Sequence, residues 1–390
     1  MDLSQRIASL DLLRGFAILG ILFMNIIVFT LPEPAYISPA WAGEPSFADK
    51  IGYSAQFMFA NAKFYSLFCL LFGAGMVVFW QRAEIKGFDA KALVKTRLRW
   101  LLLFGILHLT LLFFGDILVT YALCGMLLLG SVSLESGKLL RRGIIFIGIT
   151  ALLFTLFASL ALIDMPQEEQ MIEIPVPADK ILLLIEQATG SIGQMIYYNI
   201  KHGGALVLSL PIMFWLLGGI MLLGMALMKR GFFDKGLSNT AEALLFILGL
   251  SLSSIQLALQ WQTDFTSLFA LMLPLNSVAA VMIAIALASR GVKICQNNPN
   301  ALMPLQYAGR MAFSLYIFQS ITMTLVFRWI APGLFATLSR FEMLAVAAIM
   351  TIVQLILATW WQKNMGQGPL EKLWRHLIYR NHQPQVAVQS

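Results

Sequence analysis

The chain has 390 residues, of which 59% are hydrophobic and only 12% are charged, and its mean hydropathy is +0.78. Soluble domains carry about 25% charged and about 45–50% apolar residues, so this composition excludes an ordinary soluble protein, which would expose a large apolar surface to water. The 27 Lys and Arg outnumber the 20 Asp and Glu and give a net charge of +7. The three cysteines are widely spaced and indicate neither a disulfide framework nor a metal site, and we expect no bound metal.

Long apolar runs follow one another along the chain, each close to the ~20 residues that a helix needs to cross the membrane. Helices are required because backbone polar groups in lipid must be paired within the segment. We predict an all-α, polytopic membrane bundle of about ten transmembrane helices that forms one domain over residues 1–380, with a flexible cytoplasmic tail at 381–390. The predicted spans are 15–31, 64–80, 98–114, 117–133, 143–163, 205–228, 241–260, 266–288, 311–331 and 342–361.

Several features interrupt the apolar runs. Two long loops, 32–63 and 164–204, are predicted to lie outside the membrane, and the second is expected to hold a short helix at about 180–200. Prolines and paired glycines inside predicted spans indicate kinks or close helix contacts, which membrane helices tolerate. These residues are Pro211, Pro274, Gly73, Gly75, Gly218 and Gly219.

The basic residues indicate the orientation, since cytoplasmic loops of membrane proteins carry an excess of Lys and Arg. With a cytoplasmic amino terminus, most of the basic residues fall on the cytoplasmic side, including the dense group between Arg82 and Arg99. We therefore predict that both termini are cytoplasmic and that the positive charge reflects orientation, not nucleic-acid binding. A signal peptide cleaved after Ala40-Trp41-Ala42 is an alternative, but the apolar run is longer than the roughly 7–15 residues usual there.

A histidine and an aspartate around the third predicted span are the leading candidates for chemistry. His108 is the only histidine inside any predicted span, near mid-depth but displaced toward the outer surface. Asp116 follows in the tight turn to the next helix and could fold back toward His108. The structural alternatives are an interhelical hydrogen bond for His108 and a helix N-cap for Asp116, which follows Gly115.

Other polar residues in or near the spans fall into two groups. Arginines at cytoplasmic helix ends are either positive-inside anchors or a phosphate-binding rim: Arg14, Arg97, Arg99 and Arg310. The remaining polar residues are candidates for a cavity, although each is more often helix packing or an anchor: Asp11, Asn25, Lys63, Asn276 and Gln319.

Four segments resemble the YeiB family of bacterial inner-membrane proteins, in order and nearly end to end. They are LDLLRGFAILGILFMN (10–25), GILHLTLLFFGDILVTYALCG (105–125), YAGRMAFSLYIFQS (307–320) and GQGPLEKLWRHLIYR (366–380). The first is shared more widely with transmembrane acyltransferases similar to lysosomal heparan-α-glucosaminide acetyltransferase. The chain departs from that superfamily in the ninth span, where Phe313-Ser314-Leu315-Tyr316 stands in place of a Leu-Thr-Asn-Tyr type sequence.

The resemblance implies a multi-pass protein of the bacterial inner membrane that transfers an acyl group from cytoplasmic acyl-CoA to an extracytoplasmic acceptor, usually a sugar. It implies a catalytic histidine in a membrane helix, and His108 is the matching position. Imidazole suits a base or an acyl-accepting nucleophile near neutral pH, and Asp116 would orient the ring or hold the sugar.

The expected partners are membrane lipids, acyl-CoA as co-substrate and an acceptor. We expect no tightly bound cofactor and no nucleic acid. The sequence is compatible with a homo-oligomer but does not predict the oligomeric state. The alternatives from other classes are a transporter for a small solute or lipid, since buried polar residues also mark transport paths, and a non-catalytic membrane scaffold.

Overall fold

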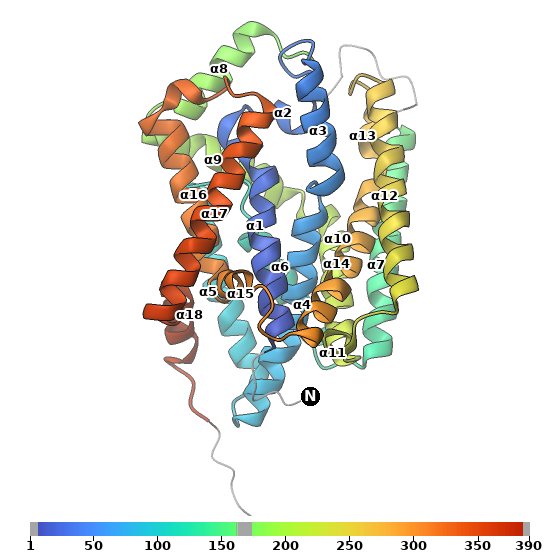
Figure 1. Ribbon diagram of the computed structural model, residues 1–390, viewed down its shortest axis with the longest axis vertical. Helices are drawn as coiled ribbons and strands as arrows, with labels where there is room; N and C mark the ends of the chain where they lie inside the picture. Colours follow the sequence, from blue (N-terminus) through green and yellow to red (C-terminus); the bar gives the residue numbers. More distant parts are fainter. Residues whose placement is uncertain (1–6, 161, 163–173, 385–390) are drawn as a thin grey trace, which may run out of the picture.

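The computed structural model describes residues 7–160, 162 and 174–384, and none of these lies in a strand. Its helices confirm the predicted all-α class (Figure 1). The long helices are α1 (Ala8–Thr30), α4 (Lys63–Ile85), α5 (Ala90–Leu111), α7 (Ser136–Leu160), α9 (Ile192–Leu208), α10 (Leu210–Lys229), α12 (Asn239–Gln262), α14 (Leu275–Asn297) and α17 (Arg340–Asn364). The shorter helices are α2 (Pro34–Ile37), α3 (Phe47–Phe59), α6 (Leu118–Leu127), α8 (Ala178–Thr189), α11 (Phe232–Lys235), α13 (Leu268–Met272), α15 (Met303–Arg310), α16 (Ala312–Leu325) and α18 (Pro369–Tyr379).

In the described part of the chain, eight helical stretches are long and apolar enough to cross a membrane. The apolar window of α7 has a mean hydropathy of 2.3, yet only 17% of it is buried inside the bundle, against 78% for α1. An apolar helix surface exposed to that extent would be unfavourable in water, so α7 requires lipid as its solvent. The eight stretches are Ala8–Thr30, Phe47–Ile85, Ser136–Leu160, Leu210–Lys229, Asn239–Gln262, Phe269–Asn297, Ala312–Ile330 and Arg340–Asn364.

Two further predicted spans, 98–114 and 117–133, correspond to α5 and α6. The first half of α5 carries a dense group of basic residues, and α6 is only ten residues long. Neither therefore meets the length and composition expected of an isolated span. Both nevertheless pack inside the helical bundle, α5 against α4 and α6 (Figure 1). The exact number of membrane passes stays a prediction.

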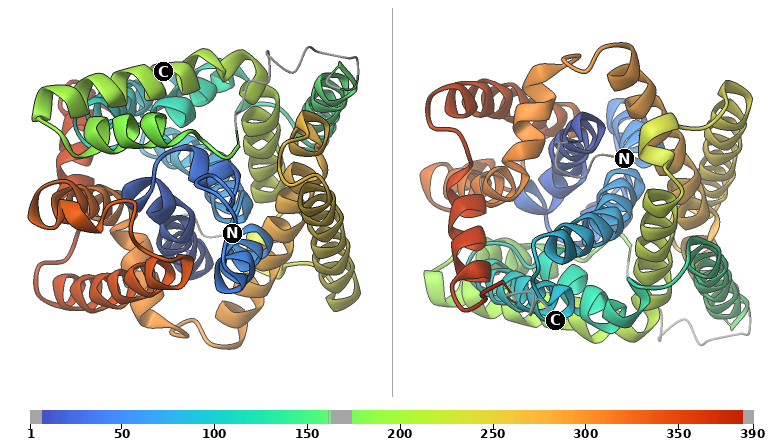
Figure 2. Two further views of the ribbon diagram at one scale, coloured as in Figure 1. Left: turned by 90° about the horizontal axis from the view of Figure 1, so that it is seen from above. Right: turned by 90° about the horizontal axis from the view of Figure 1, so that it is seen from below.

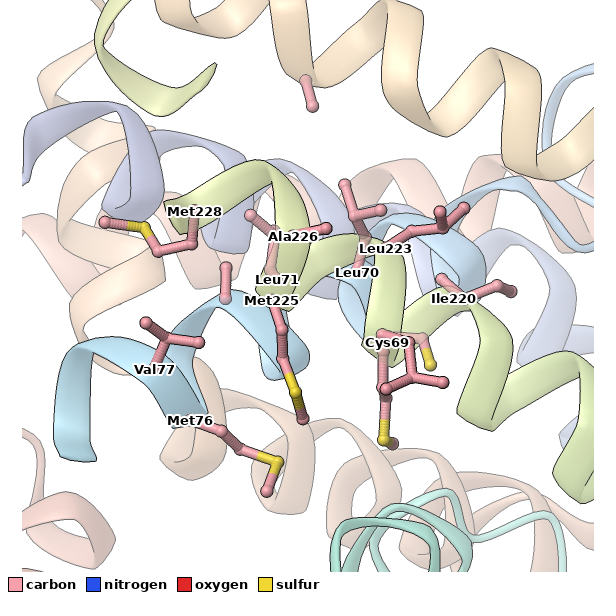
Figure 3. Close-up of a cluster of buried hydrophobic side chains, with 14 of the residues drawn as sticks. Cys69, Leu70, Leu71, Met76, Val77, Ile220, Leu223, Met225, Ala226 and Met228 are labelled. Carbon is pink, nitrogen blue, oxygen red and sulfur yellow. The ribbon is translucent and has the colours of Figure 1, made fainter. Parts of the chain in front are cut away.

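The centre of the bundle is built on close helix contacts. A Cβ on Gly73 of α4 would overlap the carbonyl oxygen of Met221 in α10, and a Cβ on Gly224 would overlap that of Leu70. The two helices therefore approach closely because glycine is present, and methionine and leucine side chains fill the space around the contact (Figure 3). The predicted role of Gly73 in a close helix contact is confirmed.

Helix α1 occupies the middle of the molecule. Viewed along the bundle, α7 and α12 lie at one side and α16, α17 and α18 at the other, with α1 between them (Figure 2). The start of α1 and the helix α18 lie at the same end of the bundle, at the bottom of Figure 1. We call this the N-terminal end; α2, α3 and α8 lie at the opposite end.

Pro211 and Pro274, predicted to mark kinks or close helix contacts, both lie at the start of a helix. Pro211 stands in the first turn of α10, and the helical run is interrupted two residues earlier at Ser209, which separates α9 from α10; Pro274 is the N-cap of α14. A proline lacks the N–H needed inside a helix but fits its first turn, so each proline marks a break within its predicted span. The predicted span 266–288 accordingly begins with the short helix α13 and continues as α14.

The helix predicted at about 180–200 is two helices, α8 and α9, which are separated at Gly190. Ser191 caps α9 through a capping box with Gln194 and thereby fixes the start of the second helix. Most of the preceding loop and the last six residues of the predicted tail lie outside the described residues. Before them, the His382 ring bonds to the Thr96 hydroxyl of α5 over 2.9 Å.

Candidate functional site

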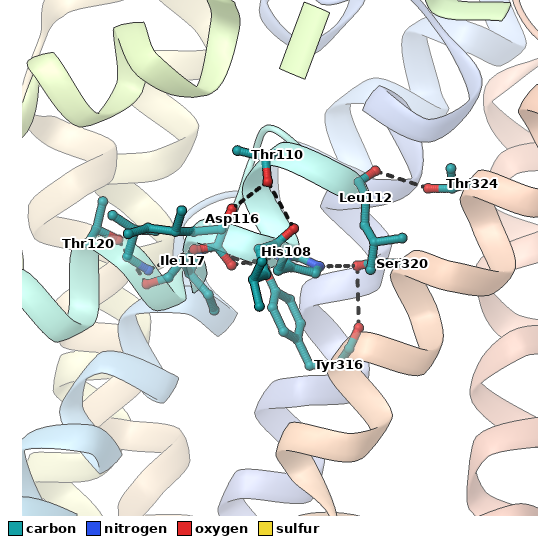
Figure 4. A network of polar contacts seen from close by, with 12 residues as sticks. His108, Thr110, Leu112, Asp116, Ile117, Thr120, Tyr316, Ser320 and Thr324 are labelled. Atoms are coloured by element: carbon teal, nitrogen blue, oxygen red, sulfur yellow. Dashed lines mark hydrogen bonds and ion pairs between the residues drawn. The ribbon is translucent and has the colours of Figure 1, made fainter. Parts of the chain in front are cut away.

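His108 and Asp116 meet at the turn that joins α5 to α6. Helix α5 ends at Leu111, three residues after His108, and the chain reverses before α6 begins at Leu118 (Figure 4). The reversal brings His108 Nδ1 to 2.7 Å from Asp116 Oδ1. The prediction that Asp116 folds back toward the ring is therefore confirmed in its geometry.

Asp116 has a second contact, which explains its position. Its other oxygen, Oδ2, accepts a hydrogen bond of 2.7 Å from the backbone N–H of Val119, in the first turn of α6. A carboxylate is favoured at a helix start because free N–H groups and the helix dipole both point at it. Asp116 therefore contacts the His108 ring through Oδ1 and the start of α6 through Oδ2, so both predicted roles are compatible.

The third member of this cluster is Ser320 of α16, which was not among the residues predicted from the sequence. Its Oγ lies 2.8 Å from His108 Nε2, so both ring nitrogens of the histidine are occupied (Figure 4). With Asp116 ionised, Nδ1 carries the proton and donates to the carboxylate, and Nε2 accepts from the Ser320 hydroxyl. The result is a chain of carboxylate, imidazole and hydroxyl drawn from three separate stretches of the fold.

Aromatic rings and burial keep the cluster dry. The exposed fractions are 2% for His108, 6% for Asp116 and 2% for Ser320. The ring of Tyr316, one turn before Ser320, lies 4.8 Å from the His108 ring, and its hydroxyl accepts from the backbone N–H of Ile117 at 3.4 Å. Electrostatic interactions among the three groups are strong in such a place because little water screens them.

A cavity of about 260 Å³ approaches the cluster from the N-terminal end. Three of the four arginines predicted to bind phosphate line it: Arg14 of α1, Arg97 of α5 and Arg310 of α15. Tyr316 and Ile117 line it as well, and both contact each other next to the histidine. The structure therefore brings these arginines together beside one hollow that leads toward His108.

The three arginines are held in different ways. Arg14 and Arg310 both face the buried carboxylate of Asp11, with N–O distances of 3.8 and 3.4 Å. The guanidinium of Arg97 instead lies 4.8 Å from the ring centres of Phe79 and Trp374, on which it stacks. Among the described residues no carboxylate forms an ion pair with Arg97, so its charge remains available to an anion.

Arg99, the fourth predicted arginine, is exposed two residues further along α5 and does not line the cavity. Asp11 was predicted as a cavity residue; the structure places it behind Arg14 and Arg310 as their shared counter-ion. Two residues, about half a turn of helix, thus separate an arginine that lines the cavity from one that is exposed. Sequence spacing alone did not distinguish the two.

A second cavity, of about 370 Å³, approaches the same turn from the opposite end. Asn25, predicted as a cavity residue, lines it together with Glu33. Much of the remaining wall is aromatic and comes from Tyr36, Phe64, Tyr65, Phe113 and Phe114. Ile117, directly after Asp116, lines both cavities, so the α5–α6 turn forms part of the partition between them.

The remaining predicted polar residues lie in other contacts. Lys63 is buried, and its Nζ donates to Asn276 Oδ1 at 2.6 Å and to the carbonyl of Phe57 at 2.9 Å. Gln319 donates to the carbonyl of Ile18 at 3.2 Å and to Gln354 at 2.8 Å. Both side chains form hydrogen bonds between helices, and neither lines either cavity.

The Gly-Pro-Leu-Glu segment at the start of α18 supports the N-terminal cavity. Glu371 Oε1 accepts from the backbone N–H groups of Phe313 at 2.8 Å and Ser314 at 3.1 Å, and so caps α16. Burial raises the pKa of this carboxyl, against hydrogen bonds from Ser314 and Phe313 that act to lower it. The motif thus fixes the start of the helix that carries Tyr316 and Ser320.

Chemically, this arrangement is suited to proton transfer at a hydroxyl next to two ligand cavities. Among residues 7–160, 162 and 174–384, no group of three His, Cys, Asp or Glu side chains is close enough to hold a metal ion. The only sequence signal for Ser320 is its place in a family segment, which does not put its hydroxyl beside His108. Ser320 is the last residue of the YAGRMAFSLYIFQS segment and lies four residues after Tyr316, on the same helix face.

Comparisons with known proteins agree with the resemblance seen in the sequence. The family model described as "Protein of unknown function (DUF418)" matches residues 227–381. The chain is 30% identical over 403 residues to "Uncharacterized protein YeiB" of Escherichia coli (strain K12), with 99% of this chain and 100% of that protein covered. It is 29% identical to "Uncharacterized protein YxaH" of Bacillus subtilis (strain 168), with 98% and 96% covered. The chain therefore belongs to the YeiB family, and the names of these relatives state no reaction.

Proposed function

We propose that this YeiB-family protein is a transmembrane acyltransferase, which moves an acyl group from acyl-CoA at the N-terminal end to an acceptor such as a sugar at the opposite end. The observation that carries the proposal is the place of the His108–Asp116 pair, at the turn between an arginine-lined cavity and an aromatic one. A transfer between two compartments needs a reactive group at a partition that both substrates approach from their own side.

The N-terminal cavity is proposed to receive the donor. Coenzyme A is polyanionic, and Arg14, Arg97 and Arg310 place positive charge along this cavity. Its volume of about 260 Å³ is at the small end for a ligand pocket. It would therefore take the extended acyl-pantetheine arm, while the nucleotide phosphates stay at the arginines. The thioester would then lie beside Tyr316, which lines this cavity and contacts the His108 ring.

The cavity at the opposite end is proposed to receive the acceptor. Its walls combine flat aromatic rings with Asn25 and Glu33, which offer hydrogen bonds to hydroxyl groups. His108 would act as the general base, taking a proton from the attacking hydroxyl through Nε2. Asp116, bound to Nδ1, would hold the ring in the required tautomer and stabilise the imidazolium that forms.

We propose the bacterial inner membrane as the location, with the N-terminal end in the cytoplasm. The basic residues support this side, because Arg14, Arg97 and Arg310 cluster at that end and cytoplasmic faces are rich in Lys and Arg. Acyl-CoA is then available where the arginines lie. Epitope tags in the loops at 86–89 and 42–45 test the orientation: the first should be accessible from the cytoplasm and the second only from outside.

The function is tested with purified protein in lipid nanodiscs supplied with acetyl-CoA. We expect saturable acetyl-CoA binding and release of free CoA thiol, faster when D-glucose or D-glucosamine is added as a hydroxyl-bearing acceptor. A His108→Gln variant should bind the donor and release no thiol above background. Absence of both binding and release, with movement of a solute through proteoliposomes instead, would overturn the proposal in favour of a transporter.

A further inference from the structure

Ser320 has an imidazole partner, which the other buried hydroxyls in the described part of the chain lack. Its Oγ lies 2.8 Å from His108 Nε2, while its bond to the carbonyl of Tyr316, one turn earlier, is longer at 3.3 Å. Serines inside membrane helices commonly bond back to the preceding turn, which satisfies the hydroxyl within its own helix. Here the shorter contact is to an imidazole from a helix 212 residues away in the sequence.

Two other hydroxyls, those of Thr324 and Thr96, have partners that differ from the partner of Ser320. Thr324, the next hydroxyl along the same face of α16, bonds the backbone carbonyl of Leu112 at 3.1 Å (Figure 4). A carbonyl only accepts, so it cannot activate that hydroxyl. Thr96 does meet an imidazole, His382, at 2.9 Å, but among the described residues no carboxylate holds the other nitrogen of that ring. Within residues 7–160, 162 and 174–384, Ser320 is the one hydroxyl bonded to an imidazole that a carboxylate holds.

We propose that Ser320 is the acyl-accepting nucleophile, so that the reaction passes through an acyl-enzyme; this inference rests on the proposed acyltransferase function. The distances of 2.7 Å and 2.8 Å on the two sides of the ring match those needed for a base that activates a serine. His108 is then the base and Asp116 the group that positions it. Of the two roles that the sequence left open for His108, base and nucleophile, it keeps that of base, and Ser320 is the nucleophile.

In the first step, Ser320 Oγ attacks the thioester carbonyl as His108 Nε2 takes the hydroxyl proton. The carbon–sulfur bond breaks, and the CoA thiolate leaves with the proton from His108, which leaves an acyl ester on Ser320. In the second step, His108 takes a proton from the acceptor hydroxyl as its oxygen attacks this ester. The bond to Ser320 Oγ breaks, and His108 returns the proton to the serine.

The two-cavity arrangement is suited to such a sequence of steps. Ser320 lies one turn along α16 from Tyr316, which lines the N-terminal cavity, and its imidazole partner is bound to the residue next to Ile117, which lines both cavities. A covalent intermediate at this point allows donor and acceptor to occupy their cavities at different times. The two substrates never have to meet across the partition.

The test incubates the protein in nanodiscs with acetyl-CoA carrying a radioactive acetyl group, without acceptor, and then denatures it in acid. We expect the label on the peptide that contains Ser320, as an ester that neutral hydroxylamine leaves largely intact. Ser320→Cys should instead give a thioester that hydroxylamine removes. Ser320→Ala should carry no label and should transfer acetyl at least about 100-fold more slowly.

Thr324→Val is the matched control, because it removes a buried hydroxyl from the same helix face without touching the imidazole; its labelling should equal that of the parent. Label on His108, or Ser320→Ala transferring within twofold of the parent while His108→Gln is inactive, overturns the nucleophile assignment and leaves the acyltransferase function standing. Absence of thiol release by the parent protein would overturn both the nucleophile assignment and the acyltransferase function. The position of the label in the parent protein, on Ser320 or on another residue, tests the nucleophile assignment even if a variant fails to fold.

Discussion

Two buried polar clusters in this bundle look alike in the sequence and differ in the structure. The cluster around Lys63 joins its ammonium group to Asn276, which also accepts from Ser253 and donates to Asn61. The other cluster joins His108 to a carboxylate and a hydroxyl. Both are nearly inaccessible to water.

The difference lies in what each cluster can still do. In the Lys63 cluster the amide oxygen of Asn276 is shared between two donors, and no imidazole is present to take a proton from Ser253. The members of both clusters lie behind the cavity walls, and in both a sequence neighbour lines a cavity: Phe64 beside Lys63 and Ile117 beside Asp116. Around His108, each group can pass a proton to the next, and Ile117 and Tyr316 connect the cluster to ligand space. Burial of a polar group in a membrane helix is therefore a weak sign of a site by itself; a proton-transferring chain beside a cavity is a stronger one.

The largest expected effect is on transfer when His108 is replaced. Gln keeps some hydrogen-bonding capacity but cannot take and release a proton near neutral pH. We expect His108→Gln to lower acetyl transfer at least about 100-fold, while stability changes by ~1 kcal/mol or less, as for a membrane hydrogen bond. Rates and unfolding midpoints are measured on the same preparations, with the exposed His376→Gln of α18 as control. Parental rates in the His108 variant would show that the His108 cluster, like the Lys63 cluster, serves only helix packing.

The reverse result is expected in the Lys63 cluster. Asn276→Leu leaves the buried Lys63 ammonium with only the Phe57 carbonyl, which should cost about 2 kcal/mol or more. Transfer per folded molecule should stay near the parental value. Thermal unfolding in detergent gives the stability, and Asn364→Leu, at an exposed position near the end of α17, should cost less than about 0.5 kcal/mol. A stable Asn276 variant without activity would assign this cluster to function.

Arg97 and Arg99 provide a smaller and more local comparison on α5. Arg97 lines the N-terminal cavity between two aromatic rings, whereas Arg99 is exposed. We expect Arg97→Gln to weaken CoA binding about tenfold, because a charge-assisted hydrogen bond is lost. The loss should shrink as salt rises, since screened charges contribute less. Calorimetric titration measures it; equal affinities for the Arg97 and Arg99 variants would place the donor elsewhere.

The smallest effect concerns pH and the cap of α16. Since burial raises the pKa of Glu371, its folded form holds a proton more tightly than its unfolded form. Its contribution to stability should therefore fall as pH rises from the ordinary glutamate pKa toward the raised value, and then level off. Glu371→Gln should remove this dependence. Unfolding midpoints of parent and variant across that pH window should separate as pH rises; parallel curves would contradict the raised pKa.

Much of the fold could be predicted from the sequence because lipid imposes one strong rule. Every spanning segment must be apolar and helical, so composition and length alone predict eight spans that overlap helices long and apolar enough to cross a membrane. The errors occurred where local chemistry outweighs hydropathy. Pro211 and Pro274 lie in apolar runs but start helices, because their geometry fits a first turn.

The site was predicted only in part, for a geometric reason. His108 and Asp116 are close in sequence, and a reversal after Gly115 was enough to suggest their contact. Ser320 comes from a helix far along the chain, so no local pattern places its hydroxyl beside the ring. Its neighbour Gln319 was predicted as a cavity residue, but its side chain bonds to Gln354 of α17. Facing directions across helices depend on tertiary packing, which spacing does not reveal.

The central claim, that an acyl group passes between the two cavities, is tested most directly in sided proteoliposomes. Protein is inserted with its N-terminal end outward, acetyl-CoA with a radioactive acetyl group is added outside, and D-glucosamine is enclosed inside. We expect labelled acetyl-glucosamine in the lumen for the parent protein and none for His108→Gln. Label on glucosamine only when it shares the outer compartment with acetyl-CoA would contradict passage between the cavities.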